Sequence, residues 1–276
     1  MRDPNFSESQ LQQAVNTAYI RHVFEKHGIW VFANVPSLIA EFDLGWDSAF
    51  HFPWYPHIPH PDHEGCNFFI QYKLSGELTS AGAKEWQYWN SEYFRFKIPH
   101  STKDSSGNFI DDYHQWDRLK DLANQNYPTF YATNSTLSKD TLRAASQAGT
   151  LLDDIPLLDV RGVGSLHKHV TFTSSSAFFL LHSEKEESPK ISFATAIKKI
   201  SESKTMSLNV ASENLLRSLS EIGSNDEGWN SDLMKIRQVS DNQAPRSIQS
   251  WMAQTLLSSF VRKHLGTEML WLPKNG

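Results

Sequence analysis

Residues 67–74 read NFFIQYKL, and this stretch decides the fold because it has the composition of a buried strand. Alternate side chains of a strand point to opposite faces. One face would be wholly apolar: Phe68, Ile70, Tyr72 and Leu74. The other face would carry an aromatic residue and two polar ones: Phe69, Gln71 and Lys73. A buried lysine costs stability unless a charged partner compensates for its lost hydration, so this pattern indicates a functional site.

The composition is that of a globular protein with a substantial core. The chain has 276 residues, of which 39% are hydrophobic, and a formal net charge of -5. This length suffices for one large domain or for one domain with an appended lobe. The net charge argues against a uniformly basic nucleic-acid-binding surface, although it is compatible with a local basic groove.

The single cysteine and the lack of long apolar segments indicate the compartment. Cys66 alone cannot form an intramolecular disulfide or a four-cysteine zinc site, and it suits a reducing cytosol. The first residues, MRDPNFSESQ, lack the apolar core of a signal peptide, and no segment has the roughly 18 apolar residues that span a bilayer. We therefore expect a cytoplasmic protein with no membrane partner.

Hydrophobic periodicity predicts an α/β fold in which a central sheet is flanked by helices. Residues 7–27 match a helix with Ser7 and Gln10 as its capping box. Later helices are expected in DDYHQWDRLKDLANQN and LSKDTLRAASQAG, and strands in EYFRFKI, PTFYATNS and HKHVTFTSSSAFFLL. IWVFANVP and SLIAEFDLGWDSAF predict further strands, LLDDIPLLDV a loop or an edge strand, and HFPWYPHIPHPDHEG a loop.

A composition shift near residues 184–190 predicts two regions, 1–183 and 184–276. SEKEESPK is charged, contains proline and has few apolar residues, which is typical of a linker. The following pattern is helical in ATAIKKI, NVASENLLRSLSEIG and SWMAQTLLSSFVRKHLG. In the last of these, an apolar stripe suggests a surface for a protein partner, unless it packs on the chain's own core: Trp251, Leu256, Phe260 and Leu265.

An acidic residue in a matching strand context provides a partner for the polar face of NFFIQYKL. Asp47 lies in EFDLGWDSAF, where Gly45 permits a sharp turn or bulge, and Asp47 and Gln71 could meet across neighbouring strands. Carboxylate and amide oxygens suit Mg²⁺, which keeps much of its hydration and needs few protein ligands. Lys73 beside them could stabilise negative charge that develops on a phosphodiester or orient an attacking water.

This order of residues resembles the PD-(D/E)xK nuclease superfamily: a helix with a glutamate, then GWD at a strand end, then IQYK on the next strand. It is similar to the QxK variant of Mrr-like restriction endonucleases, in which Gln replaces the usual acidic residue. The later order YFRF, YHQWDRL and TFYAT resembles nuclease subunits of bacterial anti-phage systems, and the likeness covers roughly residues 5–180. The interval of 24 positions from Asp47 to Gln71 is longer than usual in the superfamily, and the inserted loop accounts for it.

The resemblance implies a restriction-endonuclease-like domain over residues 1–183, with Lys73 as the catalytic lysine. Asp47 and Gln71 would be metal ligands, and Glu8 would complete the site for Mg²⁺ or, in its place, Mn²⁺. Glu25 on the same helix is an alternative to Glu8. The implied activity is endonucleolytic cleavage of double-stranded DNA in bacterial defence, as a homo-oligomer or with a second defence protein.

Each residue also has an ordinary structural explanation. Lys73 could protect an edge strand from aggregation, Asp47 could cap a turn, and Glu8 is favoured at a helix N-terminus by the helix dipole. The alternative function is therefore a catalytically inactive nuclease-fold protein that binds DNA or acts as a scaffold subunit of a defence complex. A zinc site formed by the histidine-rich loop that contains His57 and His60 is disfavoured, because the histidine spacing matches no helical ligand pair.

Overall fold

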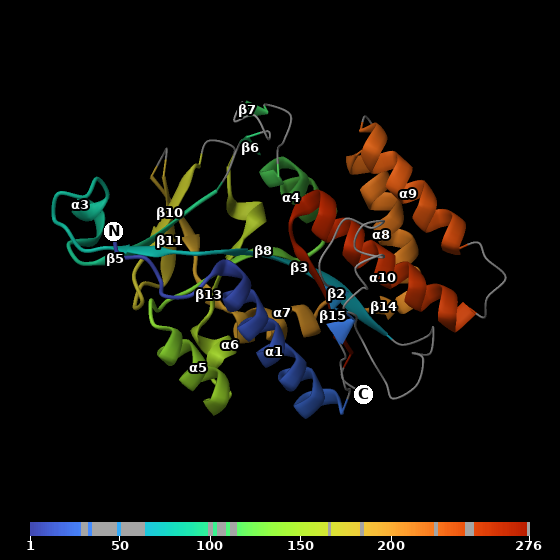
Figure 1. Cartoon of the computed structure of the whole chain (residues 1–276), viewed down its shortest axis with the longest axis horizontal. Helices are drawn as coiled ribbons and strands as arrows, with labels where there is room; N and C mark the ends of the chain where they lie inside the picture. Colours follow the sequence, from blue (N-terminus) through green and yellow to red (C-terminus); the bar gives the residue numbers. More distant parts are fainter. Residues whose placement is uncertain are drawn as a thin grey trace. The chain divides into compact units, whose positions relative to one another are not determined.

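The computed structural model describes residues 1–28, 33–34, 49–50, 64–98, 102–103, 109–110, 115–164, 167–182, 185–223, 226–240 and 246–274. These form a mixed α/β fold whose central sheet is flanked by helices (Figure 1), as the sequence predicts. The restriction-endonuclease-like identity of that fold stays a prediction, and so does the functional division into residues 1–183 and 184–276.

The elements of the first half of the chain are α1 (Glu8–His27), β1 (Ala33–Asn34), β2 (Ala49–Phe50), β3 (Glu64–Lys73), β4 (Gly76–Leu78), α3 (Trp86–Trp89), β5 (Tyr93–Lys97), β6 (Thr102–Lys103), β7 (Phe109–Ile110), α4 (Gln115–Asn124) and β8 (Thr129–Thr133). Those of the second half are α5 (Lys139–Ala148), α6 (Leu151–Asp154), β9 (Pro156–Asp159), η1 (Val160–Gly162), β10 (His169–Phe172), β11 (Phe178–His182), β12 (Glu186–Pro189), β13 (Ile191–Ser192), α7 (Phe193–Ser201), β14 (Met206–Ser207), α8 (Leu208–Ile222), α9 (Glu227–Ser240), α10 (Arg246–Leu265) and β15 (Glu268–Pro273).

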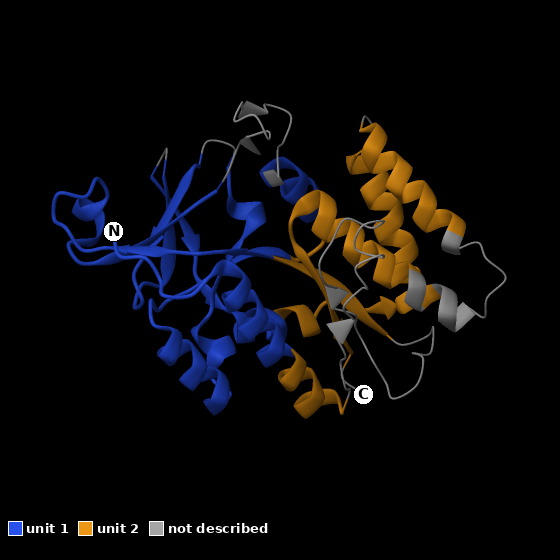
Figure 2. Ribbon diagram, viewed as in Figure 1, with its two compact units in different colours: residues 1–19, 71–123, 129–198 blue, residues 20–70, 124–128, 199–276 orange. Residues whose placement is uncertain are grey.

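The chain divides into two compact units that are interleaved in sequence (Figure 2). The first unit comprises Met1–Tyr19, Gln71–Ala123 and Thr129–Lys198. The second comprises Ile20–Ile70, Asn124–Pro128 and Lys199–Gly276. The division therefore falls within α1 and within β3.

The core of the first unit lies between two sheets. One sheet has the strand order β12-β11-β10-β5-β4, and the other contains β13, β9, β8 and the end of β3 in that order. The inner face of the first sheet is aromatic: ring centroids are 5.3 Å apart for Phe94 and Phe172, and 5.1 Å apart for Phe172 and Phe179. The ring centroids of Phe96 in β5 and Tyr131 in β8 are 6.3 Å apart, so aromatic packing joins the two sheets.

In the second unit, six residues of β3, from 65 to 70, pair antiparallel with the C-terminal strand β15. The register places Ile70 opposite Glu268 and Gly65 opposite Pro273, and β14 pairs with the start of β3. Nearly all of β3 is buried, on both faces, which shows that it is an internal strand. Cys66 is a buried free thiol in this strand.

The predicted elements around β3 are confirmed where the structure describes them. Helix α1 begins one residue after Ser7, whose Oγ accepts a hydrogen bond from the backbone N–H of Gln10 at 3.1 Å. Ser138 likewise caps α5 by accepting from the backbone N–H of Thr141, and Gly149 ends that helix in the left-handed conformation.

Two expectations from composition were wrong. The predicted linker SEKEESPK contains β12, an edge strand paired with β11; charged residues and proline are common on edge strands, and this explains the error. The predicted loop or edge strand LLDDIPLLDV contains a short helix, α6, and then β9, which lies between β8 and β13. Its proline is the first residue of the strand, where a missing N–H is tolerated.

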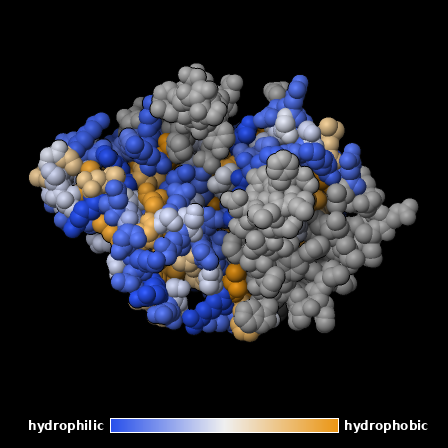
Figure 3. Space-filling view, viewed as in Figure 1, coloured by the Kyte–Doolittle hydropathy of each residue, from blue (hydrophilic) through white to orange (hydrophobic). Residues whose placement is uncertain are grey.

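The C-terminal region contains the predicted helices, but also α9 and the strands β12–β15, which its helical periodicity did not indicate. Phe260 and Leu265 of the expected partner-binding stripe are buried within the second unit, where the Phe260 ring is 4.8 Å from that of Trp229. Exposed large apolar residues in the described structure are Met1, Phe24, Tyr88, Val210 and Met234. On the face drawn in Figure 3, hydrophilic residues cover most of the described surface.

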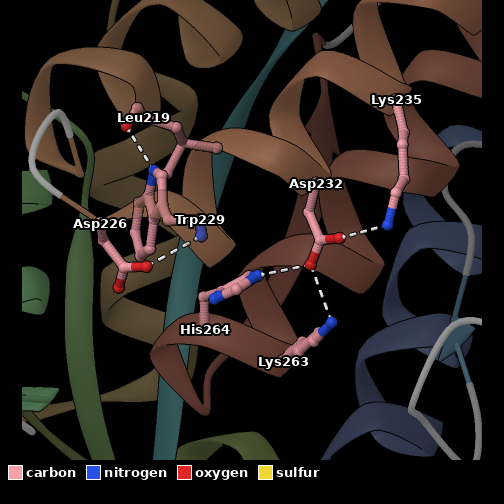
Figure 4. Close-up of polar contacts among 7 residues, drawn as sticks. All are labelled: Leu219, Asp226, Trp229, Asp232, Lys235, Lys263 and His264. Atoms are coloured by element: carbon pink, nitrogen blue, oxygen red, sulfur yellow. Dashed lines mark hydrogen bonds and ion pairs between the residues drawn. The ribbon is translucent and has the colours of Figure 1, made fainter.

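A carboxylate joins α9 to α10 (Figure 4). Asp232 accepts hydrogen bonds from Lys263 at 2.8 Å, Lys235 at 2.9 Å and the His264 ring at 3.0 Å. Burial by itself would raise the pKa of Asp232, but these three bonds outweigh it and hold the pKa well below its usual range. No helix in the described part of the chain is long and apolar enough to cross a membrane.

Substitution of Gly223 tests the packing of α8 against α9. Trp229 is fully buried and donates through Nε1 to the Leu219 carbonyl at 2.8 Å, and a Cβ on Gly223 would overlap its indole ring. Gly223→Ala should therefore lower the free energy of unfolding by about 1–3 kcal/mol. At Gly82 the nearest atom to a Cβ is Ser80 Oγ at 3.7 Å, so Gly82→Ala is the matched control. Urea denaturation that shows equal stabilities for the two variants would contradict this packing.

Substitution of Asp232 tests the carboxylate link. A carboxylate with a depressed folded pKa contributes stability above its unfolded pKa of about 3.9, and this stability is lost as the pH falls toward the folded value. Asp232→Asn should thus destabilise the protein at pH 7 by about 1–3 kcal/mol, and the difference should shrink below about pH 4. Asp140→Asn, which breaks an exposed pair with Arg143, should cost at most about 1 kcal/mol. A pH-independent effect of Asp232→Asn would refute the assignment.

Candidate functional site

Strand β3 positions two of the four predicted site residues. Gln71 and Lys73 are separated by one residue near the end of the strand, so they share a face. Gln71 is 2% exposed, and Lys73 is partly buried. The sequence correctly predicts burial of polar side chains on this strand, complete for Gln71 and partial for Lys73. Pairing with β15 ends at Ile70, so protection of a sheet edge by Lys73 stays an alternative explanation.

The side-chain oxygen of Gln71 lacks a hydrogen-bond donor. Oε1 is buried and has no partner in the described structure. Asn16 and Asn67 also have buried amide nitrogens without partners, but each accepts a bond through its oxygen. An unpaired buried acceptor costs about 1–3 kcal/mol, so its retention requires a reason such as a bound cation or ligand donor.

Lys73 and Glu8 come from distant parts of the sequence and interact electrostatically. Burial lowers the pKa of the Lys73 amine, and the charge of Glu8 acts in the opposite direction. Glu8 is the first residue of α1, so the helix start brings its carboxylate within electrostatic range of the end of β3. The structure thus brings together Glu8 and Lys73, and separately Gln71 and Lys73.

A buried hydrogen bond fixes α1 against β3. Tyr72 alternates with Gln71 and Lys73 and points to the opposite face, where its hydroxyl donates to Asn16 Oδ1 at 2.8 Å. The helix is therefore held on the Tyr72 face of the strand. Glu8, at the N-terminus of this helix, lies within electrostatic range of Lys73.

Side-chain hydrogen bonds also fix the chain directly after Lys73. The Asn134 side chain accepts from the backbone N–H of Ser75 at 2.8 Å and donates to the Ser75 carbonyl at 2.9 Å. The hydroxyls of Ser75 and Thr133 are 2.5 Å apart. These bonds replace a strand partner beyond the end of β3 and hold the backbone that carries Lys73.

The remaining predicted residues have different outcomes. Asp47 and the histidine-rich loop with His57 and His60 lie outside the described residues. The carboxylate of Glu25 accepts a hydrogen bond from Arg21 at 2.7 Å, which favours Glu8 over Glu25 as the residue near Lys73. Among the described residues, no group of three or more His, Cys, Asp and Glu is arranged to hold a metal ion.

A second polar cluster was not found from the sequence. Buried Glu85 accepts from the Tyr93 hydroxyl at 2.9 Å and from Arg95 Nη1 at 3.4 Å, close to His169 and His182. Arg95, His169 and His182 come from separate segments, and their association depends on antiparallel pairing of β5, β10 and β11. No local motif connects these segments.

Comparison of the chain with models of known protein families, with curated proteins and with solved structures gives no match.

The unpaired oxygen of Gln71 generates a stability prediction with a matched control. Met has a similar shape and no hydrogen-bonding demand, so Gln71→Met should leave the free energy of unfolding unchanged or raise it. Gln254 is similarly buried, but it donates to Asn67 and accepts from Ser212, so Gln254→Met should lower the free energy of unfolding by about 1–3 kcal/mol. Chemical denaturation measures the free energy of unfolding of both variants. If Gln71→Met lowered it as much as Gln254→Met does, Gln71 would have a structural role.

Proposed function

We propose that the protein is a Mg²⁺-dependent endonuclease that hydrolyses phosphodiester bonds of double-stranded DNA. The observation that carries the proposal is the unpaired, buried Gln71 Oε1 beside Lys73, whose charge interacts with Glu8. An internal strand has little reason to retain both side chains unless a ligand engages them. The resemblance of the sequence to QxK nucleases supplies the reaction class.

The donor set suits a hard cation. Asp47, Gln71 and Glu8 would offer carboxylate and amide oxygens, which Mg²⁺ prefers and Mn²⁺ accepts. A bound cation would supply Lewis acidity and lower the pKa of an attacking water. The unpaired Gln71 oxygen fits this role, because coordination would satisfy it without displacement of an existing hydrogen bond.

Lys73 would act on the phosphate. Burial lowers the pKa of its amine while Glu8 opposes that effect, so the carboxylate helps to keep the amine charged in a poorly solvated place. A cation there stabilises negative charge that develops on phosphate oxygens more strongly than an exposed one would. The bonds among Ser75, Thr133 and Asn134 would limit movement of the backbone that carries it.

A second candidate function is a catalytically inactive nuclease-fold subunit that binds DNA or acts as a scaffold. It is favoured by the position of α1 on the Tyr72 face, because Gln71 points to the face opposite to the helix that carries Glu8. In either case we propose a cytoplasmic role in bacterial defence, as a homo-oligomer or with a second defence protein. A subunit without activity would bind DNA but would not cleave it in Mg²⁺ or Mn²⁺.

Plasmid cleavage tests the enzymatic proposal. Purified protein should nick or linearise supercoiled DNA in Mg²⁺ and not in EDTA. Lys73→Met retains the apolar stem and removes the charge, so it should reduce the rate roughly 100-fold or more while the circular dichroism spectrum is unchanged. Asp47→Ala should have a similar effect.

Lys139→Met is the matched control for Lys73→Met, because Lys139 is exposed on α5 in the same unit. It should retain full activity. Failure of the wild type to cleave in either metal would favour the inactive alternative. Joint loss of solubility and activity in Lys73→Met would instead identify a structural lysine.

A further inference from the structure

The outer face of the first unit's five-stranded sheet carries a row of basic side chains. In the antiparallel register, His169 of β10 lies opposite Lys97 of β5 on one side and His182 of β11 on the other. Arg95 lies one pair further along the same face, opposite Thr171. The alternating residues Phe94, Phe96 and Phe172 face the aromatic core, so the polarity of the two faces differs sharply.

The positive charge of this row is poorly balanced within the described structure. Glu85, the carboxylate that acts on both histidines, is already engaged by the Tyr93 hydroxyl and by Arg95. Burial lowers the pKa of His169, and the charges of Arg95, Lys97 and Lys84 lower it further, against the opposing effect of Glu85. The two histidines are therefore mostly neutral near pH 7, and the positive charge comes from Arg95, Lys97 and Lys84, an arrangement that favours occupation by an anion.

An exposed aromatic ring lies beside the row. Tyr88 of α3 is 41% exposed, and its ring centroid is 5.7 Å from that of His182. Lys185 Nζ lies 5.2 Å from the centroid of the Tyr88 ring. The neighbouring Trp89 donates to Thr171 at 3.0 Å and stacks on Phe178 at 5.4 Å. These contacts attach α3 to the sheet and hold the Tyr88 ring next to His182.

We propose that this face, formed by Lys84, Tyr88, Lys97, His169, His182 and Lys185, binds single-stranded nucleic acid. Cations provide contacts to successive phosphates, and an exposed ring provides a platform on which a base stacks; together they are the two components of single-strand recognition. A duplex would use the cations but would leave Tyr88 without a base, because its bases are stacked on one another. The inference goes beyond the proposed cleavage of duplex DNA and requires no metal.

Binding of a fluorescent oligothymidylate to the full chain in EDTA tests the inference, because cleavage cannot contribute there. Lys84→Gln/Lys97→Gln removes two exposed charges and should weaken binding roughly tenfold at moderate salt. The slope of log K against log salt concentration should fall by about 0.7 for each phosphate that the variant no longer neutralises. Lys139→Gln, an exposed lysine outside the cluster, should change the affinity little. The proposal would be overturned if Lys139→Gln weakened binding as much as the Lys84→Gln/Lys97→Gln double substitution does.

Tyr88 separates base stacking from general anion binding. Tyr88→Ala should weaken oligothymidylate binding roughly fivefold or more, whereas Tyr88→Phe should retain it. Binding of an abasic oligomer should be weaker and insensitive to Tyr88→Ala. No binding by the wild type, or equal affinity for the abasic oligomer, oligothymidylate and a duplex of the same length, would overturn the proposal. A protein that passes this test but does not cleave plasmid would fail only the enzymatic proposal.

Discussion

Strand β3 is buried on both faces, and the rest of the described structure depends on how its polar groups are satisfied. A buried strand needs backbone partners, and β15, β14 and β8 all pair with β3. Beyond its end, the Asn134 side chain performs the same task for Ser75. The division between the two compact units falls within this strand, as it does within α1.

Most buried polar side chains near β3 have a clear structural role. Asn67 bonds to Gln254 of α10, which in turn accepts from Ser212 of α8, so one network connects the strand to two helices. Tyr72 connects it to α1 in the same way. Satisfied networks of this kind specify a single packing arrangement. The unpaired oxygen of Gln71 differs, and this contrast is the reason that we propose a ligand at that position.

The outer face of the sheet that contains β5, β10 and β11 shows a different imbalance, one of charge. Glu85 partly neutralises it, and its pKa is low even though burial would raise it, because Tyr93 and Arg95 stabilise the carboxylate. The two imbalances need different ligands: an oxygen acceptor attracts a cation, whereas a row of cations attracts phosphates.

The sequence by itself determined the elements whose signals are local. The periodicity of residues 7–27, the cap at Ser138 and the alternation in NFFIQYKL depend on neighbours within one or two turns, and each predicted element is present. Gln71 and Lys73 could be selected because a polar pair in an apolar strand is visible in eight consecutive residues. The mixed α/β class follows from the same signals.

Only the tertiary structure decided which distant residues meet. Strand β12 was mistaken for a linker because edge strands and linkers share charged composition, and pairing with β11 is not encoded locally. The row Lys97, His169 and His182 exists because two antiparallel registers align three separate segments. The unpaired state of Gln71 Oε1 likewise depends on every group packed around it, and no sequence pattern reports the absence of a donor in three dimensions.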